Sequence, residues 1–327
     1  MIRRLLATRE TILFAAILLL LGVIYSRFPA FVAPGNLVRV FNDTAPLILL
    51  AAGQMVVILT RCIDLSVAAN LALTGMVVAM LNVAMPELPI AVILVVAICF
   101  GAMLGMMNGL LVWKLQIPPI VVTLGTMTIF RGLIFVLSDG RWVNSHQMSD
   151  AFKAFPRSTL LGLPMLSWFA IMALALLMLV MNRTTMGRAF YAVGGNPHAA
   201  TYIGLDVGRT QFLAFTISGA LAGLTGYLWV SRFGVAYVDI AGGFELDVVA
   251  ACVIGGISIA GGVGTVTGAL LGALFLGVIK NALPVVNVSP FWQMAISGAA
   301  IIIAVGFNAK SGREKGRIIL KRAEATT

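Results

Sequence analysis

Long apolar runs recur along almost the whole chain, from Thr11 to Phe307, and few polar residues separate them. Each run approaches the roughly 20 residues that an α-helix needs to cross the hydrocarbon core of a bilayer. The runs are continuously apolar rather than alternating, which favours helices over a β-barrel. We therefore expect an all-α, polytopic membrane bundle of about ten transmembrane helices, forming a single transmembrane domain over residues 1–327.

The individual runs predict where the chain crosses the membrane. The expected spans are residues 11–25, 45–60, 67–82, 89–113, 117–137, 161–182, 211–230, 246–260, 263–283 and 291–307. The first span follows basic residues, as in a signal peptide, but no small-x-small cleavage pattern comes after it. We interpret it as a retained helix.

Charge is scarce and unevenly placed. Only 10% of the residues are charged, where soluble chains have about a quarter. The net charge of +10 does not indicate nucleic-acid binding, because the basic residues lie in short links and at both termini rather than on one face. With ten spans, the side that holds the termini carries about twice as many basic residues as the other side, so we expect both termini to be cytoplasmic.

The sequence lacks the usual signatures of catalysis and of metal binding. The three cysteines lie within or beside apolar runs, and the two histidines have no ligand-like spacing to other donors. There is no phosphate-binding loop, no nucleophile elbow and no His-Glu-x-x-His motif. We predict a protein that is not an enzyme and needs no metal or cofactor.

The longest link on the expected cytoplasmic side, residues 183–210, contains signals for a short helix. Asn196 can cap free backbone N–H groups, and Pro197 suits the first helical position. Gly204 is placed to end the helix in a left-handed conformation. A plain connector would need only a few residues, so we interpret this segment as a docking element for a cytoplasmic partner.

A few polar side chains interrupt the apolar runs and are candidates for a transport path. Asp64 follows Arg61 between two short spans, where it either lines a path or serves only to cap a helix or pair with Arg61. Gln54 and Asn70 lie inside spans, where polar groups join helices more often than they contact a ligand. Ser258 is the fourth candidate.

Glycines are concentrated between residues 255 and 277. Gly264, Gly268 and Gly272 recur at every fourth position, which predicts close packing of two helices. The Gly-Gly pairs just before them favour an alternative, a discontinuous helix of the kind that lines transport paths.

Four blocks, in order, resemble the membrane permeases of bacterial ATP-binding-cassette (ABC) importers for monosaccharides, which carry ribose, xylose, rhamnose or autoinducer-2. They are residues 61–68 (RCIDLSVA), the Pro, Thr-Leu-Gly-Thr and Arg-Gly pattern of 118–132, the Gly-Arg, Gly-Gly-Asn and Ala-Ala pattern of 187–200, and the glycine-rich 245–264. The family has Gly-Gly where this chain has Arg61-Cys62, and Gly where it has Ala68. These departures look most like the rhamnose and autoinducer-2 branches.

The resemblance implies a multi-pass permease of the bacterial inner membrane, with a basic cytoplasmic tail at 308–327. Its expected partners are the lipid bilayer, a cytoplasmic sugar-type ABC ATPase on a separate chain, a second permease chain in a homo- or heterodimer, and a periplasmic sugar-binding protein. The loop 183–210 would couple to the ATPase through its short helix, by residues Gly195, Asn196, Pro197, Ala199, Ala200, Tyr202 and Gly204.

Two other functions compete with this one. A branched-chain amino-acid permease of the same superfamily is the first, although the Ile-Asp-Leu-Ser-Val block favours the sugar branch. The second is an ion-coupled secondary transporter that works alone. Such transporters usually bury carboxylates within spans, whereas Asp64, Glu245 and Asp247 all lie at span ends here.

Overall fold

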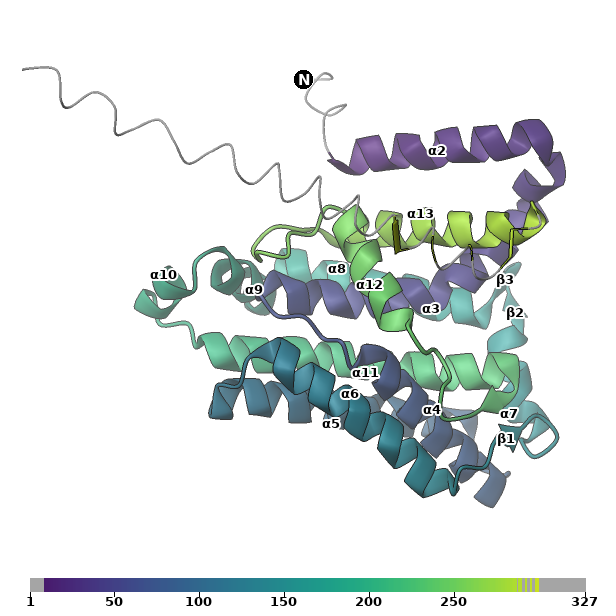
Figure 1. The fold of residues 1–327 in the computed structure, drawn as a ribbon, viewed down its shortest axis with the longest axis horizontal. Coiled ribbons are helices and arrows are strands. Elements are labelled where there is room, and N and C mark those ends of the chain that lie inside the picture. The colour runs from purple at the N-terminus through teal and green to yellow at the C-terminus, as the bar shows by residue number, and fades with distance from the viewer. Residues whose placement is uncertain (1–8, 287, 290–291, 293–294, 296–297, 300–327) are drawn as a thin grey trace, which may run out of the picture.

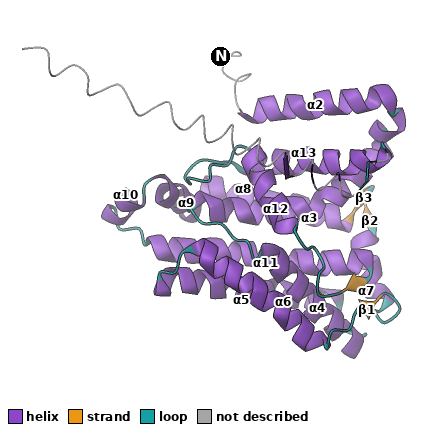
Figure 2. Cartoon of the chain, in the orientation of Figure 1, coloured by secondary structure: helices purple, strands orange, loops and turns teal. Residues whose placement is uncertain are grey.

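The computed structural model describes residues 9–286, 288–289, 292, 295 and 298–299. Most of the predicted span 291–307 and the whole basic tail 308–327 lie outside these residues. Figure 1 shows a bundle whose long helices run roughly alongside one another, and Figure 2 shows that strands form only short pairs at one end.

Helices account for nearly all of the described secondary structure. The first half of the chain forms α2 (Arg9–Arg27), η1 (Pro29–Val32), α3 (Pro34–Leu59), α4 (Val67–Ala84), α5 (Ile90–Leu115) and α6 (Pro119–Ser138). The second half forms α7 (Asp150–Ala154), η2 (Phe155–Arg157), α8 (Met165–Arg183), α9 (Thr185–Gly195), α10 (Pro197–Tyr202), α11 (Val207–Phe233), α12 (Phe244–Ile254) and α13 (Val266–Val285).

The strands are two-residue pieces that form two antiparallel pairs. Strand β1 (Val143–Asn144) pairs with β4 (Val235–Ala236), and β2 (Thr159–Leu160) pairs with β3 (Leu163–Pro164). All of them lie with α7 at one end of the bundle, which we call the α7 end, while α9 and α10 project at the opposite end, the α10 end (Figure 1).

Eight of the described helices are long and apolar enough to cross a bilayer: α2, α3, α4, α5, α6, α8, α11 and α13. The predicted all-α, polytopic membrane bundle is therefore confirmed. The total of ten spans and the cytoplasmic position of both termini stay predictions.

Helix α11 lies at the centre and packs closely against α5. Carbon atoms of Gly223 and Gly219 would lie 2.5 and 2.9 Å from Cβ atoms added at Gly101 and Gly105, respectively. Such contact leaves no room for a side chain on either helix, so the two backbones touch through their glycines. Within a membrane this van der Waals contact replaces the hydrophobic effect that joins helices in water.

The predicted glycine stripe joins α12 to α13. A Cβ on Gly268 would meet the carbonyl of Gly255, and one on Gly272 would lie 2.7 Å from the Gly255 nitrogen. Gly264 has a φ of +156° and lies before α13 begins, so it is part of the preceding loop rather than of the stripe. The predicted close packing is confirmed for the last two members.

The predicted span 246–260 is wrong as a continuous helix. Helix α12 has only 11 residues and ends at Ile254. The chain leaves the helix at Gly255, and Gly256 has a φ of +83° that other residues rarely adopt. The alternative of a discontinuous helix is what the structure shows, with a loop at residues 255–265 before α13.

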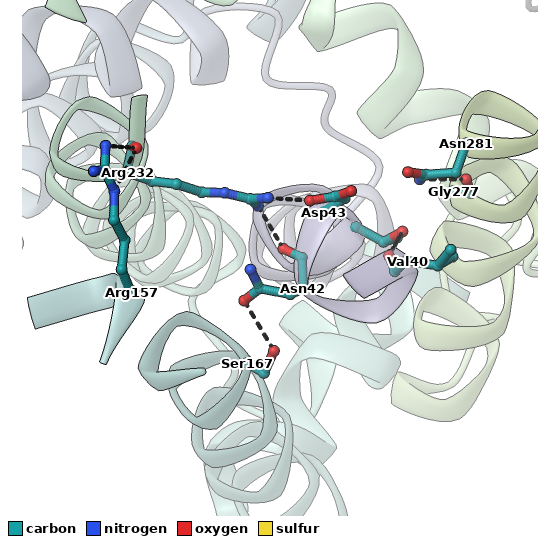
Figure 3. Close-up of polar contacts among 9 residues, drawn as sticks. Val40, Asn42, Asp43, Arg157, Ser167, Arg232, Gly277 and Asn281 are labelled. Atoms are coloured by element: carbon teal, nitrogen blue, oxygen red, sulfur yellow. Dashed lines mark hydrogen bonds and ion pairs between the residues drawn. The ribbon is translucent and has the colours of Figure 1, made fainter. Parts of the chain in front are cut away.

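The α7 end is held together by two arginines (Figure 3). Arg232, in the last turn of α11, donates to the carbonyl oxygen of Asn42 (2.8 Å) and pairs with Asp43. Arg157 donates through Nε to the Arg232 carbonyl oxygen (3.0 Å). Both Asn42 and Asp43 belong to α3, which begins at Pro34 rather than at residue 45. The apolar pattern missed its first turns because polar residues interrupt them.

The glycine contact between α5 and α11 gives a first prediction. We expect Gly101→Ala to lower the stability of the bundle by about 1–3 kcal/mol, because its methyl group would overlap backbone that cannot rotate away. Gly125→Ala is the control, since Gly125 lies in α6 with no atom within 4 Å of an added Cβ. Thermal unfolding in detergent measures both. Equal unfolding temperatures for the two variants would contradict the proposed packing.

Candidate functional site

The link 183–210 is mostly helical and forms the α10 end. Helix α9 begins at the cap Thr184, whose side chain accepts a hydrogen bond from Gly187 N (3.2 Å). Phe190 and Val193 are buried under it. Sequence analysis missed this helix, although the spacing of Met186, Phe190 and Val193 is helical and could have revealed it.

Helix α10 confirms the predicted short helix. The Asn196 side chain accepts a hydrogen bond from Ala199 N (3.1 Å), and Pro197 is the first helical residue. Gly204 has a φ of +85° and ends the segment. The three residues act as cap, start and stop, as their physical properties predict.

The two faces of α10 differ sharply. Ala200 is only 2% exposed and faces the body of the protein. Tyr202 and Ile203 are 91% and 73% exposed, respectively, so two large apolar side chains project from the α10 end. Such a pair on a capped helix is a surface that another protein can cover.

Arg61 connects the end of α3 to this helical link. Its Nε donates to the carbonyl oxygen of Gly194 (2.7 Å) and its Nη2 to that of Gly195 (2.9 Å). The suggested pairing of Arg61 with Asp64 is therefore wrong. The Asp64 carboxylate instead accepts hydrogen bonds from the backbone N (2.9 Å) and the hydroxyl (2.6 Å) of Ser66.

Arg61 also has a φ of +64°, in the left-handed region. This conformation costs a non-glycine residue about 1–2 kcal/mol. Hydrogen bonds from a charged donor contribute about 1.5–3 kcal/mol each and offset that cost. The chain thus keeps a left-handed backbone that glycine would adopt without strain, and adds a side chain that binds α9.

Three backbone segments meet beside Arg61. Gly262 N donates to the Leu59 carbonyl oxygen (3.0 Å), which joins the 255–265 loop to the end of α3. A Cβ on Gly194 would overlap Leu59 O and lie 2.5 Å from Gly262 N. We call Leu59, Arg61, Gly194, Gly261 and Gly262 the glycine junction.

Tyr191 adds a further contact between α9 and the 255–265 loop. Its hydroxyl donates to the carbonyl oxygen of Gly264 (2.9 Å). Burial raises the pKa of this hydroxyl, so it stays a neutral donor across the physiological range. Any displacement of α9 therefore pulls on both α3 and the loop that precedes α13.

The non-helical segment at residues 60–66 is mostly buried, and side chains from neighbouring helices satisfy its polar groups. Thr123 donates to Ile63 O (3.2 Å), and Gln211 Nε2 donates to Thr60 O (3.2 Å). Asn108 Nδ2 donates to the Ser66 hydroxyl (2.8 Å). Irregular backbone is tolerated at membrane depth only where protein surrounds it in this way.

Of the four candidate path residues, only Gln54 and Asp64 are in direct contact. Gln54 is fully buried, and its amide, oriented to satisfy both atoms, bonds Asp64 O (3.2 Å) and Asp64 N (3.1 Å). Asn70 is buried elsewhere and donates to Gly101 O (3.0 Å), across to α5. Ser258 is half-buried in the 255–265 loop, where its N donates to Val263 O (2.9 Å). Their place on a transport path stays a prediction.

Arg131, midway along α6, reaches the chain between α11 and α12. Its Nη1 donates to the carbonyl oxygens of Val238 and Ile240, both at 2.7 Å. It therefore anchors the loop that leads into the half-helix α12. Within the residues that the structure describes, no three His, Cys, Asp or Glu side chains lie together as metal ligands would.

Comparison with known proteins identifies a family and several relatives. Residues 36–305 match the family described as the permease component of branched-chain amino acid transport systems. The autoinducer 2 import system permease protein LsrC of Enterobacter sp. (strain 638) is 38% identical, over 92% of this chain and 86% of its own length. No solved structure matches this one.

Two further relatives bear the names of sugar importers. The ribose import permease protein RbsC of Haemophilus influenzae is 34% identical, over 89% of this chain and 90% of its own length. The galactose/methyl galactoside import permease protein MglC of Escherichia coli is 33% identical, over 94% of this chain and 96% of its own length.

The glycine junction gives a second prediction, with a neighbouring glycine as control. We expect Gly194→Ala to separate α9 from α3, because its methyl group would overlap Leu59 O, whereas nothing lies within 4 Å of a Cβ on Gly195. Hydrogen exchange followed by mass spectrometry should show faster exchange in peptides covering 59–66 and 194–205 for Gly194→Ala alone. Unchanged exchange in both variants would show that the junction is not a tight contact.

Proposed function

Because this chain belongs to the family of ABC importer permeases that includes importers of sugars and of autoinducer 2, we propose that it moves a monosaccharide or a similar small polyol across the membrane. It is an inner-membrane protein, and we propose the rhamnose or autoinducer-2 branch for its cargo. Like other permease subunits, it is not itself the ATP-hydrolysing enzyme.

The relatives favour the sugar importer over the competing functions. Those described above import ribose, galactosides or autoinducer 2, so the branched-chain amino-acid alternative is not favoured, in spite of the family's description. That description also makes the chain a component of a larger transport system. A component of this kind does not fit an ion-coupled transporter that works alone.

The observation that carries the proposal is the exposed apolar tip of α10. We propose that Tyr202 and Ile203 enter a cleft on a cytoplasmic ATPase carried on a separate chain. Asn196, Pro197 and Gly204 define the ends of the helix, and Gly195 and Ala199 lie beside its cap. A cavity of about 560 Å³ lies next to α10, between it and the link from α5 to α6.

The glycine junction explains how motion of α10 could reach the membrane. Arg61 ties α9 to the end of α3, and Gly262 ties the same point to the loop before α13. Closure of the ATPase on α10 would thus move α3, α12 and α13 together, because rigid packed elements transmit displacement. The path of the cargo would lie beside these elements, near Gln54, Asp64, Asn70 and Ser258.

The proposal sets the orientation and the partners. The α10 end is cytoplasmic, and the start of α2 lies there too, since Thr265 Oγ1 donates to Glu10 Oε1 (3.0 Å). A single permease domain covers residues 1–327, with the coupling loop at 183–210 and a cytoplasmic tail at 308–327. A second permease chain and a periplasmic binding protein complete the importer.

Ala200 is not a suitable position to test this proposal, because it is buried. A bulky charged residue there would push α10 off the bundle, since Ala200 faces inward. Loss of transport in such a variant would not distinguish docking from folding. Substitutions at Tyr202 and Ile203 do distinguish them, because both side chains are exposed.

We predict that Tyr202→Glu with Ile203→Glu lowers transport by at least about tenfold and abolishes co-purification of the ATPase. Two charges would have to be desolvated in the docked state, at a cost of several kcal/mol. Leu161→Glu is the control, because Leu161 is 85% exposed at the α7 end. Affinity capture of the complex and uptake into proteoliposomes measure the effects. If the double variant still captures the ATPase, α10 is a connector only.

We predict that Arg61→Gly separates ATP hydrolysis from transport. Glycine accepts the left-handed backbone without strain, so the relieved strain offsets part of the lost hydrogen bonding and the protein should still fold. Loss of both hydrogen bonds to α9 should lower the cargo moved per ATP, while the ATPase still binds. The exposed Arg188→Ala, on α9, is the control. An unchanged ratio in Arg61→Gly would exclude a coupling role for Arg61.

A further inference from the structure

A small pocket lies at the α7 end, opposite α10, where α4 and α6 end. Its volume is about 270 Å³. The side chains around it come from the last turns of both helices and from the chain leading into and out of β1. Those used below are Ser138, Arg141, Trp142 and Gln147.

Ser138, the last residue of α6, lines this pocket with an unpaired hydroxyl. The residue is 7% exposed, and its Oγ has no hydrogen-bond partner in the described structure. A buried hydroxyl without a partner costs about 1–3 kcal/mol, so a polar group that enters the pocket and bonds Ser138 gains that energy. The hydroxyl is therefore available to a ligand in the pocket.

Trp142 provides an aromatic wall. Its ring stacks on that of Tyr237, with centroids 4.8 Å apart and planes inclined by 24°. The pairing of β1 with β4 fixes this arrangement, because Val143 lies opposite Ala236. Trp142 nonetheless remains 57% exposed, so Tyr237 supports the indole without covering it.

Internal contacts also fix the other two polar side chains of the pocket, Gln147 and Arg141. Gln147 Oε1 accepts a hydrogen bond from Asn144 N (2.8 Å), which fixes the direction of its NH₂ group. Arg141 is paired with the exposed Asp139 (3.3 Å), so the rim has no net charge from this pair. An apolar aromatic wall with a few placed donors and acceptors is typical of small-molecule sites.

We propose that this pocket binds the ring of a monosaccharide or similar polyol as the cargo enters the permease. An uncharged ring with C–H faces and many hydroxyls matches an exposed indole, a buried unpaired hydroxyl and a neutral rim. A fatty chain would leave the Ser138 hydroxyl unpaired, and an ion would find no charge to neutralise. The inference rests on the proposed function, which it extends by locating an entry site at the α7 end.

The test measures binding to the whole chain in lipid nanodiscs by saturation-transfer difference NMR. D-ribose, D-galactose and L-rhamnose are the probes, and cyclohexanol is the control for a ring with one hydroxyl. We expect at least one sugar to bind saturably and more tightly than cyclohexanol. Ser138→Ala and Trp142→Ala should each weaken that sugar about three- to tenfold, the value of one hydrogen bond or one aromatic contact.

The variants separate binding from folding. Ser138→Ala breaks no internal hydrogen bond, so its unfolding temperature should equal or exceed that of wild type. Ser167→Ala is the control, because it removes a buried serine hydroxyl of α8 that lies outside the pocket, and its sugar affinity should be unchanged.

The proposed sugar site is contradicted if no sugar binds, if cyclohexanol binds equally well, or if both pocket variants keep wild-type affinity. It is also contradicted if Trp142→Ala keeps its sugar affinity but captures the binding protein less well, because the surface would then be a docking site for that protein. Uptake by the assembled importer is measured separately. Uptake by wild type with no sugar bound to this chain rejects the pocket alone, whereas no uptake of any monosaccharide rejects the proposed function.

Discussion

The fold depends on places where two backbones touch. Between α5 and α11 the contact uses Gly101 and Gly223, and at the α10 end the same kind of contact joins Gly194 to Leu59 and Gly262. In lipid there is no hydrophobic gain from bringing two apolar helices together, so this close packing must supply the attraction. The glycine junction is therefore a continuation of the packing that holds the bundle, and whatever moves α9 acts on that packing.

A second constraint acts on the irregular segments. Inside a membrane, a backbone that leaves the helix loses its partners and must find others within the protein. Thr123, Gln211 and Gln54 provide them for residues 60–66, and Arg131 binds two carbonyl groups before α12. Most polar side chains inside the bundle thus serve the backbone, which leaves few of them to contact a cargo.

The sequence predicts those features that depend on local chemistry. Apolar runs long enough to cross a bilayer locate the spans, and Asn196, Pro197 and Gly204 define α10 to within a residue because capping and left-handed turns are local preferences. The break after Ile254 could be predicted only as one of two alternatives, because an apolar run does not show where a helix ends. The partner of Arg61 lies more than a hundred residues away, and no spacing rule connects it to Gly194. The roles of Gln54 and Asn70 likewise depend on which helix becomes a neighbour.

The position of Arg61 has a consequence for exchanging parts between related importers. The segment that faces the ATPase looks like a self-contained module, because it has its own cap and its own stop. Its carbonyl groups at Gly194 and Gly195 are nevertheless held from outside the module by a side chain at the end of α3. A chimera that receives residues 183–210 but carries glycine at position 61 would inherit the helix without its anchor. Recombination between such permeases would therefore have to transfer both pieces together.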